Sequence, residues 1–89
     1  MKVTLGEEGV EKSWQLGFPK VVKCVYCKGE ARVGFVAHEG IDPKDKKGPR
    51  VCNLHKNGGG GDYWLHDCCA VAVYFCKKCL KTTALYNQG

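Results

Sequence analysis

The sequence predicts a small β-rich domain that is stabilised by a metal ion. Three observations lead to this prediction. The chain has only 89 residues, so its hydrophobic core supplies roughly 3–5 kcal/mol, and we expect further stabilisation by disulfides, a metal ion or oligomerisation. Several stretches alternate apolar and polar residues, which is typical of strands. Seven cysteines are present, and four of them form two closely spaced pairs.

Residues 1–20 are predicted to form an N-terminal segment with one edge strand. Trp14, Leu16 and Phe18 alternate with polar or small residues, as expected for a short strand. Pro19 follows this stretch and lacks the N–H group that a sheet ladder requires. The strand must therefore lie at a sheet edge or end at this proline.

Residues 21–87 are predicted to form the main domain, and its first long strand covers residues 30–38. Strict alternation in this strand would place Val33, Phe35 and Ala37 on one face of the sheet. The strand follows directly after a cysteine pair. This order predicts a hairpin whose turn contains the pair.

Two further strands are predicted in the C-terminal half of the chain. Residues 63–75 carry apolar residues on both faces, which indicates a central strand. Residues 80–86 alternate again and form the next strand. Between the first and second strands, residues 39–62 contain prolines, four consecutive glycines and a cluster of lysines. We interpret this segment as a long loop insertion.

Two Cys-x-x-Cys pairs, Cys24 with Cys27 and Cys76 with Cys79, carry the main prediction about function. In each pair a tight turn places both sulfur atoms on one side of the chain, where they can bind one ion at about 2.3 Å. Gly29 suits the backbone geometry that often follows such a turn. Two turns provide four thiolates, so we predict one structural Zn²⁺ at these cysteines. Iron uses the same ligand set in rubredoxin-like sites and is the alternative metal.

With these two pairs and the β-rich segments that flank them, the chain resembles the zinc ribbon family. The resemblance covers residues 21–38 and 68–87. It implies a three-stranded antiparallel sheet with two zinc knuckles, a knuckle being the turn that carries a cysteine pair. It also implies a binding role, because zinc ribbons serve in transcription, translation, replication and protein–protein contacts. The chain departs from the commonest knuckle pattern, since neither pair has a proline after its first cysteine or a glycine directly after its second.

A second metal site is predicted from the remaining cysteines and histidines. Its ligands are Cys52, His55, His66 and Cys68, with Cys69 as a substitute for Cys68. Cys52 and His55 have the spacing of a third knuckle, and residues 66 and 68 of a strand share one face. The alternative interpretation is that these cysteines are buried apolar residues and that the histidines are solvated. His38, at the end of the first long strand, is a further candidate ligand.

The formal net charge of +5 suggests an anionic partner such as nucleic acid. Four thiolates and one Zn²⁺ together lower this charge to about +3, because zinc ligands must be deprotonated. Basic residues cluster within residues 44–50 and 77–81, and the chain also contains aromatic residues such as Tyr26 and Trp64. Lysines beside aromatic rings suit single-stranded nucleic acid, although lysines are equally common on any wet surface.

The expected function is that of a binding module. We expect a zinc-stabilised adaptor for protein–protein interactions, with nucleic-acid binding as the alternative. A metal-dependent hydrolase or nuclease is the second alternative, and it would need an open second site with Asp62 or Asp67 as the base. A closed Cys₄ site offers no such position, so we do not expect an enzyme.

The expected location is the cytoplasm, with no membrane contact. The sequence starts without a signal-peptide pattern and contains no apolar run of the roughly 18–20 residues that span a bilayer. The number of cysteines is odd, which disfavours a framework of disulfides. Reduced cysteines in close pairs are typical of intracellular metal sites.

Overall fold

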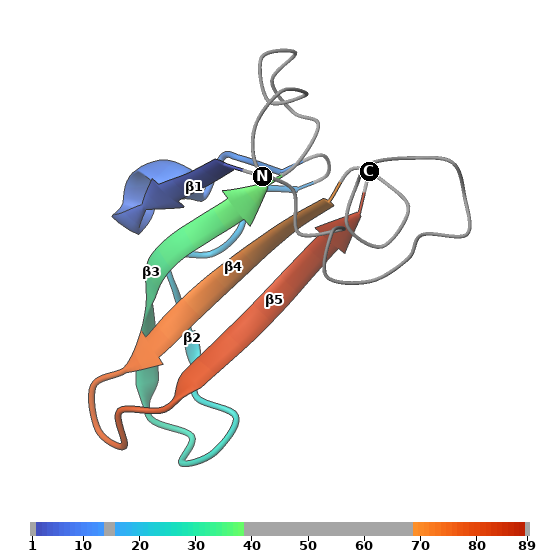
Figure 1. The fold of residues 1–89 in the computed structure, drawn as a ribbon. Helices are drawn as coiled ribbons and strands as arrows, with labels where there is room; N and C mark the ends of the chain where they lie inside the picture. The colour runs from blue at the N-terminus through green and yellow to red at the C-terminus, as the bar shows by residue number, and fades with distance from the viewer. Residues whose placement is uncertain (1, 14–15, 39–68, 89) are drawn as a thin grey trace, which may run out of the picture.

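The computed structural model describes residues 2–13, 16–38 and 69–88, which form one antiparallel sheet and a short 3₁₀ helix (Figure 1). The elements in chain order are β1 (Lys2–Leu5), η1 (Gly6–Gly9), β2 (Val21–Lys23), β3 (Glu30–His38), β4 (Cys69–Cys76) and β5 (Thr82–Gln88). Their order across the sheet is β1, β3, β4, β5, and β2 pairs with β3. No helix among these residues is long and apolar enough to cross a membrane.

Among the described strands, β3 is the longest, and it pairs with two short strands along one edge. Its first part pairs with β2, and its second part pairs with β1. Its bounds, Glu30–His38, agree with the predicted strand over residues 30–38. The resemblance implied three strands, whereas the described sheet has five, because β1 and β2 both add to this edge of β3.

The prediction of a central strand is confirmed for the part that the structure describes, Cys69–Cys76. Residues 63–68 of the predicted strand and the predicted loop insertion over residues 39–62 lie outside the described residues. β4 lies between β3 and β5 and pairs with both in antiparallel fashion. Its alternate residues Ala70, Ala72 and Tyr74 are fully buried. The predicted strand over residues 80–86 corresponds to β5, which begins two residues later.

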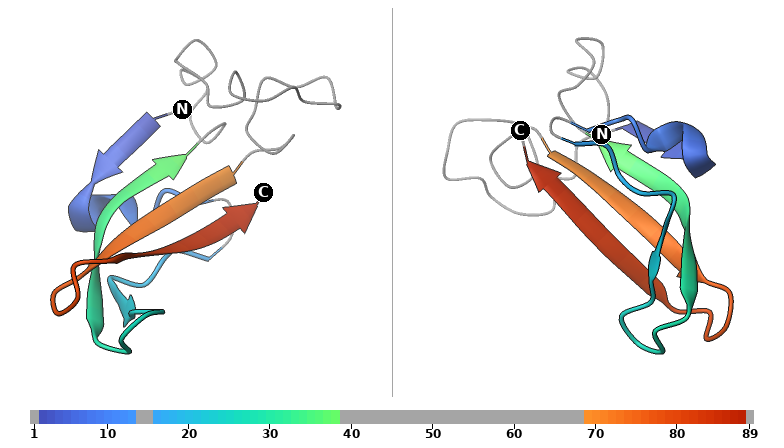
Figure 2. Two further views of the ribbon diagram at one scale, coloured as in Figure 1. Left: turned by 60° about the horizontal axis from the view of Figure 1, so that its bottom comes forward. Right: turned by 180° about the vertical axis from the view of Figure 1, so that it is seen from behind.

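The edge strand of the N-terminal segment is Lys2–Leu5, and the predicted strand around Leu16 and Phe18 is wrong. Residues 16–20 form no strand; Phe18 is buried there, and its backbone N–H donates a hydrogen bond to the Val10 carbonyl at 2.9 Å. Seen from behind, the chain between η1 and β2 crosses one face of the sheet (Figure 2). Leu16 is exposed whereas Phe18 is buried, so the two residues do not share one face as a strand would require.

A bulge between Val33 and Phe35 changes which residues of β3 are buried. Val33 is buried before the bulge, and Val36 continues the buried face after it. The predicted shared face of Val33, Phe35 and Ala37 is therefore wrong. The extra residue at Gly34 shifts the alternation by one position, which exchanges the two faces of the strand.

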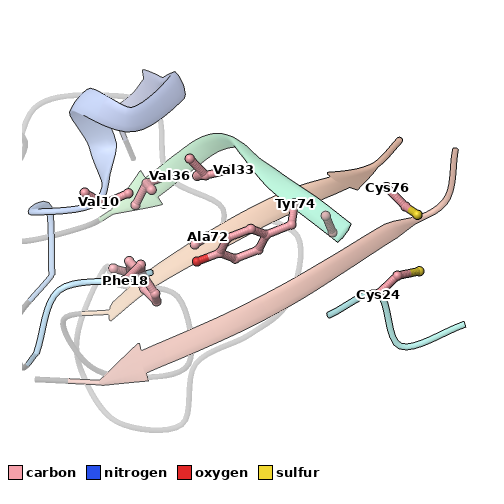
Figure 3. Packing of buried hydrophobic residues seen from close by; sticks show 10 residues of the cluster. Val10, Phe18, Cys24, Val33, Val36, Ala72, Tyr74 and Cys76 are labelled. Atoms are coloured by element: carbon pink, nitrogen blue, oxygen red, sulfur yellow. The ribbon is translucent and has the colours of Figure 1, made fainter. Parts of the chain in front are cut away.

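The core lies between the sheet and the segment that crosses it. Tyr74 and Val36 are fully buried, and Val10 and Phe18 of the crossing segment belong to the same apolar cluster (Figure 3). The Tyr74 hydroxyl donates a hydrogen bond to the backbone carbonyl of Pro19 at 2.6 Å. Tyr74 therefore fixes the crossing segment against the sheet through both its ring and its hydroxyl.

Candidate metal centre

The two cysteine pairs lie in turns at the same end of the sheet. One turn joins β2 to β3, and the other joins β4 to β5. Because β3 and β4 are antiparallel, the start of β3 lies beside the end of β4, with Ala31 opposite Cys76. Figure 3 shows Cys24 and Cys76 together at this end, beyond Tyr74. Sheet topology therefore brings together two motifs that are far apart in the sequence.

The structure brings the four predicted ligands close to one another. The Sγ atoms of Cys24, Cys27, Cys76 and Cys79 all lie within 4.8 Å of one another. Cys24 Sγ is 3.6 Å from Cys79 Sγ, and Cys27 Sγ is 3.5 Å from Cys76 Sγ. Four sulfur atoms bound at about 2.3 Å to one tetrahedral ion are about 3.8 Å apart. The two measured separations are close to this value, so the four sulfur atoms are near enough to share one ion.

Backbone N–H groups of the turns donate hydrogen bonds to the sulfur atoms. Three of these bonds are 3.4 Å long, from Tyr26 to Cys24, from Gly29 to Cys27 and from Lys78 to Cys76. Such bonds favour the thiolate form and fix the orientation of each sulfur. The turns are therefore shaped to present negatively charged sulfur to a cation.

The same contacts shift the thiol pKa values in opposite directions. The backbone N–H groups of Cys27 and Tyr26 lower the pKa of Cys24 from 9.0 to about 6. The Lys81 backbone N–H favours the thiolate of Cys79, but burial and hydrogen bonds with the three other cysteines raise the pKa of Cys79 to about 11. Four adjacent thiolates repel one another, so full deprotonation of the cluster requires a bound cation.

Both turns have the same backbone conformation at the residue after the second cysteine. Lys28 and Leu80 have φ values of 65° and 62°, in the left-handed region that favours glycine. Their N–H groups donate to the carbonyl groups of Cys24 and Cys76 at 3.0 and 3.1 Å. Although Lys28 and Leu80 stand where a knuckle commonly has glycine, both turns adopt the same backbone conformation.

Gly29 is needed for space and not for a left-handed backbone. Among the described glycines, a positive φ occurs at Gly6 and not at Gly29. A Cβ atom at Gly29 would lie 3.2 Å from Cys27 Sγ and 3.6 Å from Cys76 Sγ. The expectation that Gly29 serves the turn conformation is therefore corrected: its missing side chain leaves room for sulfur atoms of both pairs.

Two residues outside the cysteine motifs hold the turns in place, and no pattern in the sequence predicts either role. Thr83 is buried in β5, and its Oγ1 accepts a hydrogen bond from the Val25 N–H at 3.2 Å. The Glu30 carbonyl accepts one from the Lys77 N–H at 3.2 Å, and the two side chains form an ion pair of the same length. Each contact joins one hairpin to the other, so no local pattern could reveal it.

The predicted second site lies outside the described residues. This applies to Cys52, His55, His66 and Cys68. Of the remaining candidates, Cys69 is buried at the start of β4, and His38 is buried at the end of β3. Both lie at the end of the sheet opposite the cysteine cluster. Within the described ranges, the four-cysteine group is the one cluster that could hold a metal ion.

The site has to be interpreted from its own geometry. No protein-family model, curated protein or solved structure matches the chain. Four thiol groups that converge from two hairpin turns suit one tetrahedral ion that prefers sulfur ligands. The four cysteines are thus positioned to hold a zinc-type metal ion.

Proposed function

We propose that this chain is a zinc ribbon-like binding module in which one structural Zn²⁺ supports an adaptor surface for another protein. Its ligands are Cys24, Cys27, Cys76 and Cys79. The convergence of their sulfur atoms from two hairpin turns is the observation that carries the proposal. Four thiolates complete a tetrahedral coordination sphere and leave no position for a substrate, so we assign no catalytic step to this site.

The proposed role of the metal is to join the two hairpins. A bound ion supplies folding free energy, and comparable small sites show apparent binding of about 10–16 kcal/mol. The chain itself orients the sulfur atoms through the backbone N–H groups of its turns. We prefer zinc to iron because zinc is redox-inert and typical of closed structural sites. Thiolates must stay reduced to bind it, so the proposal includes a reducing compartment such as the cytoplasm.

The proposed partner-binding region is the knuckle surface, formed by the exposed side chains of both turns. Its apolar members are Val25, Tyr26 and Leu80, of which 61%, 61% and 81% are exposed. Five exposed lysines lie in the turns or next to them in the sequence, namely Lys23, Lys28, Lys77, Lys78 and Lys81. Lys77 is paired with Glu30, which leaves an excess of positive charge beside the exposed apolar side chains. Such a surface suits a partner that is apolar and acidic.

One contact favours the alternative function, which is binding of single-stranded nucleic acid. The Lys81 Nζ lies 4.6 Å from the centroid of the Tyr26 ring, and cations beside aromatic rings suit stacked bases and phosphates. Val25 and Leu80, however, are aliphatic and offer no stacking surface. A protein partner uses all three apolar side chains, so the adaptor is the first proposal and nucleic acid is the second.

Titration with fluorescent probes separates the two proposals. The zinc-loaded protein is titrated with acidic peptides that contain leucine and phenylalanine, and with single-stranded oligonucleotides, over a range of salt concentrations. The adaptor proposal predicts peptide binding that Leu80→Ser weakens and Tyr26→Phe retains. Failure to bind any such peptide would contradict it. Oligonucleotide binding with a steep salt dependence, lost in Tyr26→Ala, would support the alternative instead.

A further inference from the structure

The sheet face opposite the core is apolar across all four strands of the main strand order. The strand registers place its side chains in two cross-strand rows, which are Val3, Ala37, Val71 and Tyr86, and Leu5, Phe35, Val73 and Ala84. We call these eight residues the open face. An antiparallel sheet with one face in water normally carries polar residues on that face. Neither row contains a charged side chain, which is a departure from this rule.

The open face is also accessible in the described structure. Leu5, Val3 and Tyr86 are 74%, 52% and 42% exposed. Figure 1 looks onto this face, with the chain between η1 and β2 behind the sheet, and no described segment crosses in front of it. Phe75 continues this face beside the rows, where its ring lies 6.3 Å from that of Phe35. Arg32 lies opposite Phe75 on β3 and places a charged side chain at the edge of the apolar area. An apolar area of this kind marks an interaction site.

We propose that the open face binds a second copy of this chain, so that two sheets pack face to face in a symmetric dimer. Charge is the first argument for this occupant. Each zinc-loaded copy carries a net charge of about +3, so two copies repel each other least where they meet through surfaces without charged side chains. The open face meets this condition, whereas the lysines of the knuckle surface lie at one end of the sheet.

Shape is the second argument for a second copy. On β3 the small Ala37 lies beside the large Phe35, and on β5 the small Ala84 lies beside Tyr86. A large side chain of one copy can therefore fill the space above a small residue of the other. The inner faces of β-sandwiches pack in this way, and a twofold axis applies the same fit to both copies.

The exposed area sets the expected strength of the dimer. At roughly 150–200 Å² for each fully exposed side chain, the observed exposures of Val3, Leu5, Phe75 and Tyr86 give on the order of 350 Å² per copy. The half-buried members of the face bring the total for two copies to about 1,000 Å², at the lower end of specific interfaces. We therefore expect a dimer with a Kd in the micromolar range.

Sedimentation equilibrium of the zinc-loaded full chain tests the proposal. The average mass should rise from the 9.8 kDa of one chain towards twice that value between about 5 and about 500 µM. Leu5→Lys and Ala84→Lys alter exposed members of one row, and each should raise the dimer Kd at least about tenfold by placing like charges in the interface. Leu80→Lys, at an exposed position on the knuckle surface, is the matched control and should leave the Kd unchanged.

Two results would overturn the proposal. One is a wild-type mass of one chain at the highest concentration, which would mean that something other than a second copy uses this face. The other is unchanged association of a lysine variant whose zinc content and amide dispersion show that it is folded. The proposal does not rest on the proposed adaptor function. Variants of Leu80 test the knuckle surface, whereas Leu5→Lys and Ala84→Lys test the dimer.

Discussion

Lys28 and Leu80 occupy equivalent positions in the two cysteine turns, and both have a left-handed backbone, with φ values of 65° and 62°. This conformation costs a non-glycine residue roughly 1–2 kcal/mol. The turns keep it because the N–H group of each of these residues is bonded to the first cysteine of its pair. The metal-binding end of the sheet therefore stores local strain in both turns.

Leu80→Gly should stabilise the zinc-loaded protein by about 0.5–1 kcal/mol. Glycine relieves the left-handed strain, and the side chain that is lost is 81% exposed and makes little packing contribution. Part of the gain is offset because glycine also makes the unfolded chain more flexible. Urea unfolding of this variant and of Leu80→Ala checks the prediction. The alanine variant keeps the strain, so equal stability of the two would contradict this interpretation.

Gly29→Ala should lower the affinity for zinc by about 10- to 100-fold. The new Cβ atom would lie 3.2 Å from Cys27 Sγ, so the sulfur would have to move out of its position. Competition with a chromophoric chelator measures the affinity. Gly6→Ala is the control, because its φ of 67° predicts a loss of stability while no atom near Gly6 belongs to the site. An unchanged affinity in Gly29→Ala would show that the sulfur cluster tolerates the extra methyl group.

The ion pair between Glu30 and Lys77 should be visible in the titration of Glu30. The hydrogen bond from Lys77, its charge and that of Arg32 lower the pKa of Glu30. Because the pKa of Glu30 is lower in the folded state than in the unfolded state, its carboxylate stabilises the fold at pH values above the unfolded pKa. This contribution is lost as the pH falls through the folded pKa. Lys77→Gln should therefore raise the pKa of Glu30 towards its ordinary value.

The carbon-13 chemical shift of the Glu30 carboxyl group, followed between about pH 7 and pH 5, measures this change. This pH range lies above the ordinary pKa of glutamate. The Glu30 signal should begin to move at higher pH in Lys77→Gln than in the wild type. Lys78→Gln serves as the control, since Lys78 is not among the groups that shift the Glu30 pKa. Identical titration curves of Glu30 in Lys77→Gln and Lys78→Gln would show that Lys77 does not lower the pKa of Glu30.

The sequence predicted those parts of the fold that depend on local pattern. The two Cys-x-x-Cys spacings identified the four residues whose sulfur atoms converge. The alternation over residues 30–38 identified β3, and the apolar stretch ending near Phe75 identified the central strand. In each case a local pattern was sufficient to identify the element or the cysteine pair, whereas the convergence of the two pairs depends on the pairing of β3 with β4.

The sequence failed where distant residues determine the structure. β1 exists because Lys2–Leu5 pairs with the end of β3, and nothing within those four residues reveals that partner. The bulge at Gly34 is coupled to Phe75 on β4, whose ring occupies the space that a Cβ atom at Gly34 would need. An isolated glycine within a strand pattern is a known sign of a bulge, so this one could have been predicted.

Substitution of single cysteines should separate the metal site from the rest of the fold. Cys24→Ser and Cys79→Ser should each lose both the bound zinc and the folded structure, because either change removes one of the four sulfur ligands. Cys69→Ser should keep its zinc, since Cys69 lies at the other end of β4, although burying a hydroxyl there costs about 1–3 kcal/mol. Native mass spectrometry gives the metal content of each variant. Loss of zinc from Cys69→Ser together with retention in Cys24→Ser would contradict the assignment.

The most direct test of the central claim is a proton–nitrogen correlation spectrum recorded before and after a chelator removes the metal. The claim is that one Zn²⁺ held by the four cysteines is structural and coupled to folding. The zinc-loaded protein should give dispersed amide signals that collapse into a narrow range on chelation and return when zinc is added. A metal-free protein that keeps its dispersed spectrum would contradict the claim.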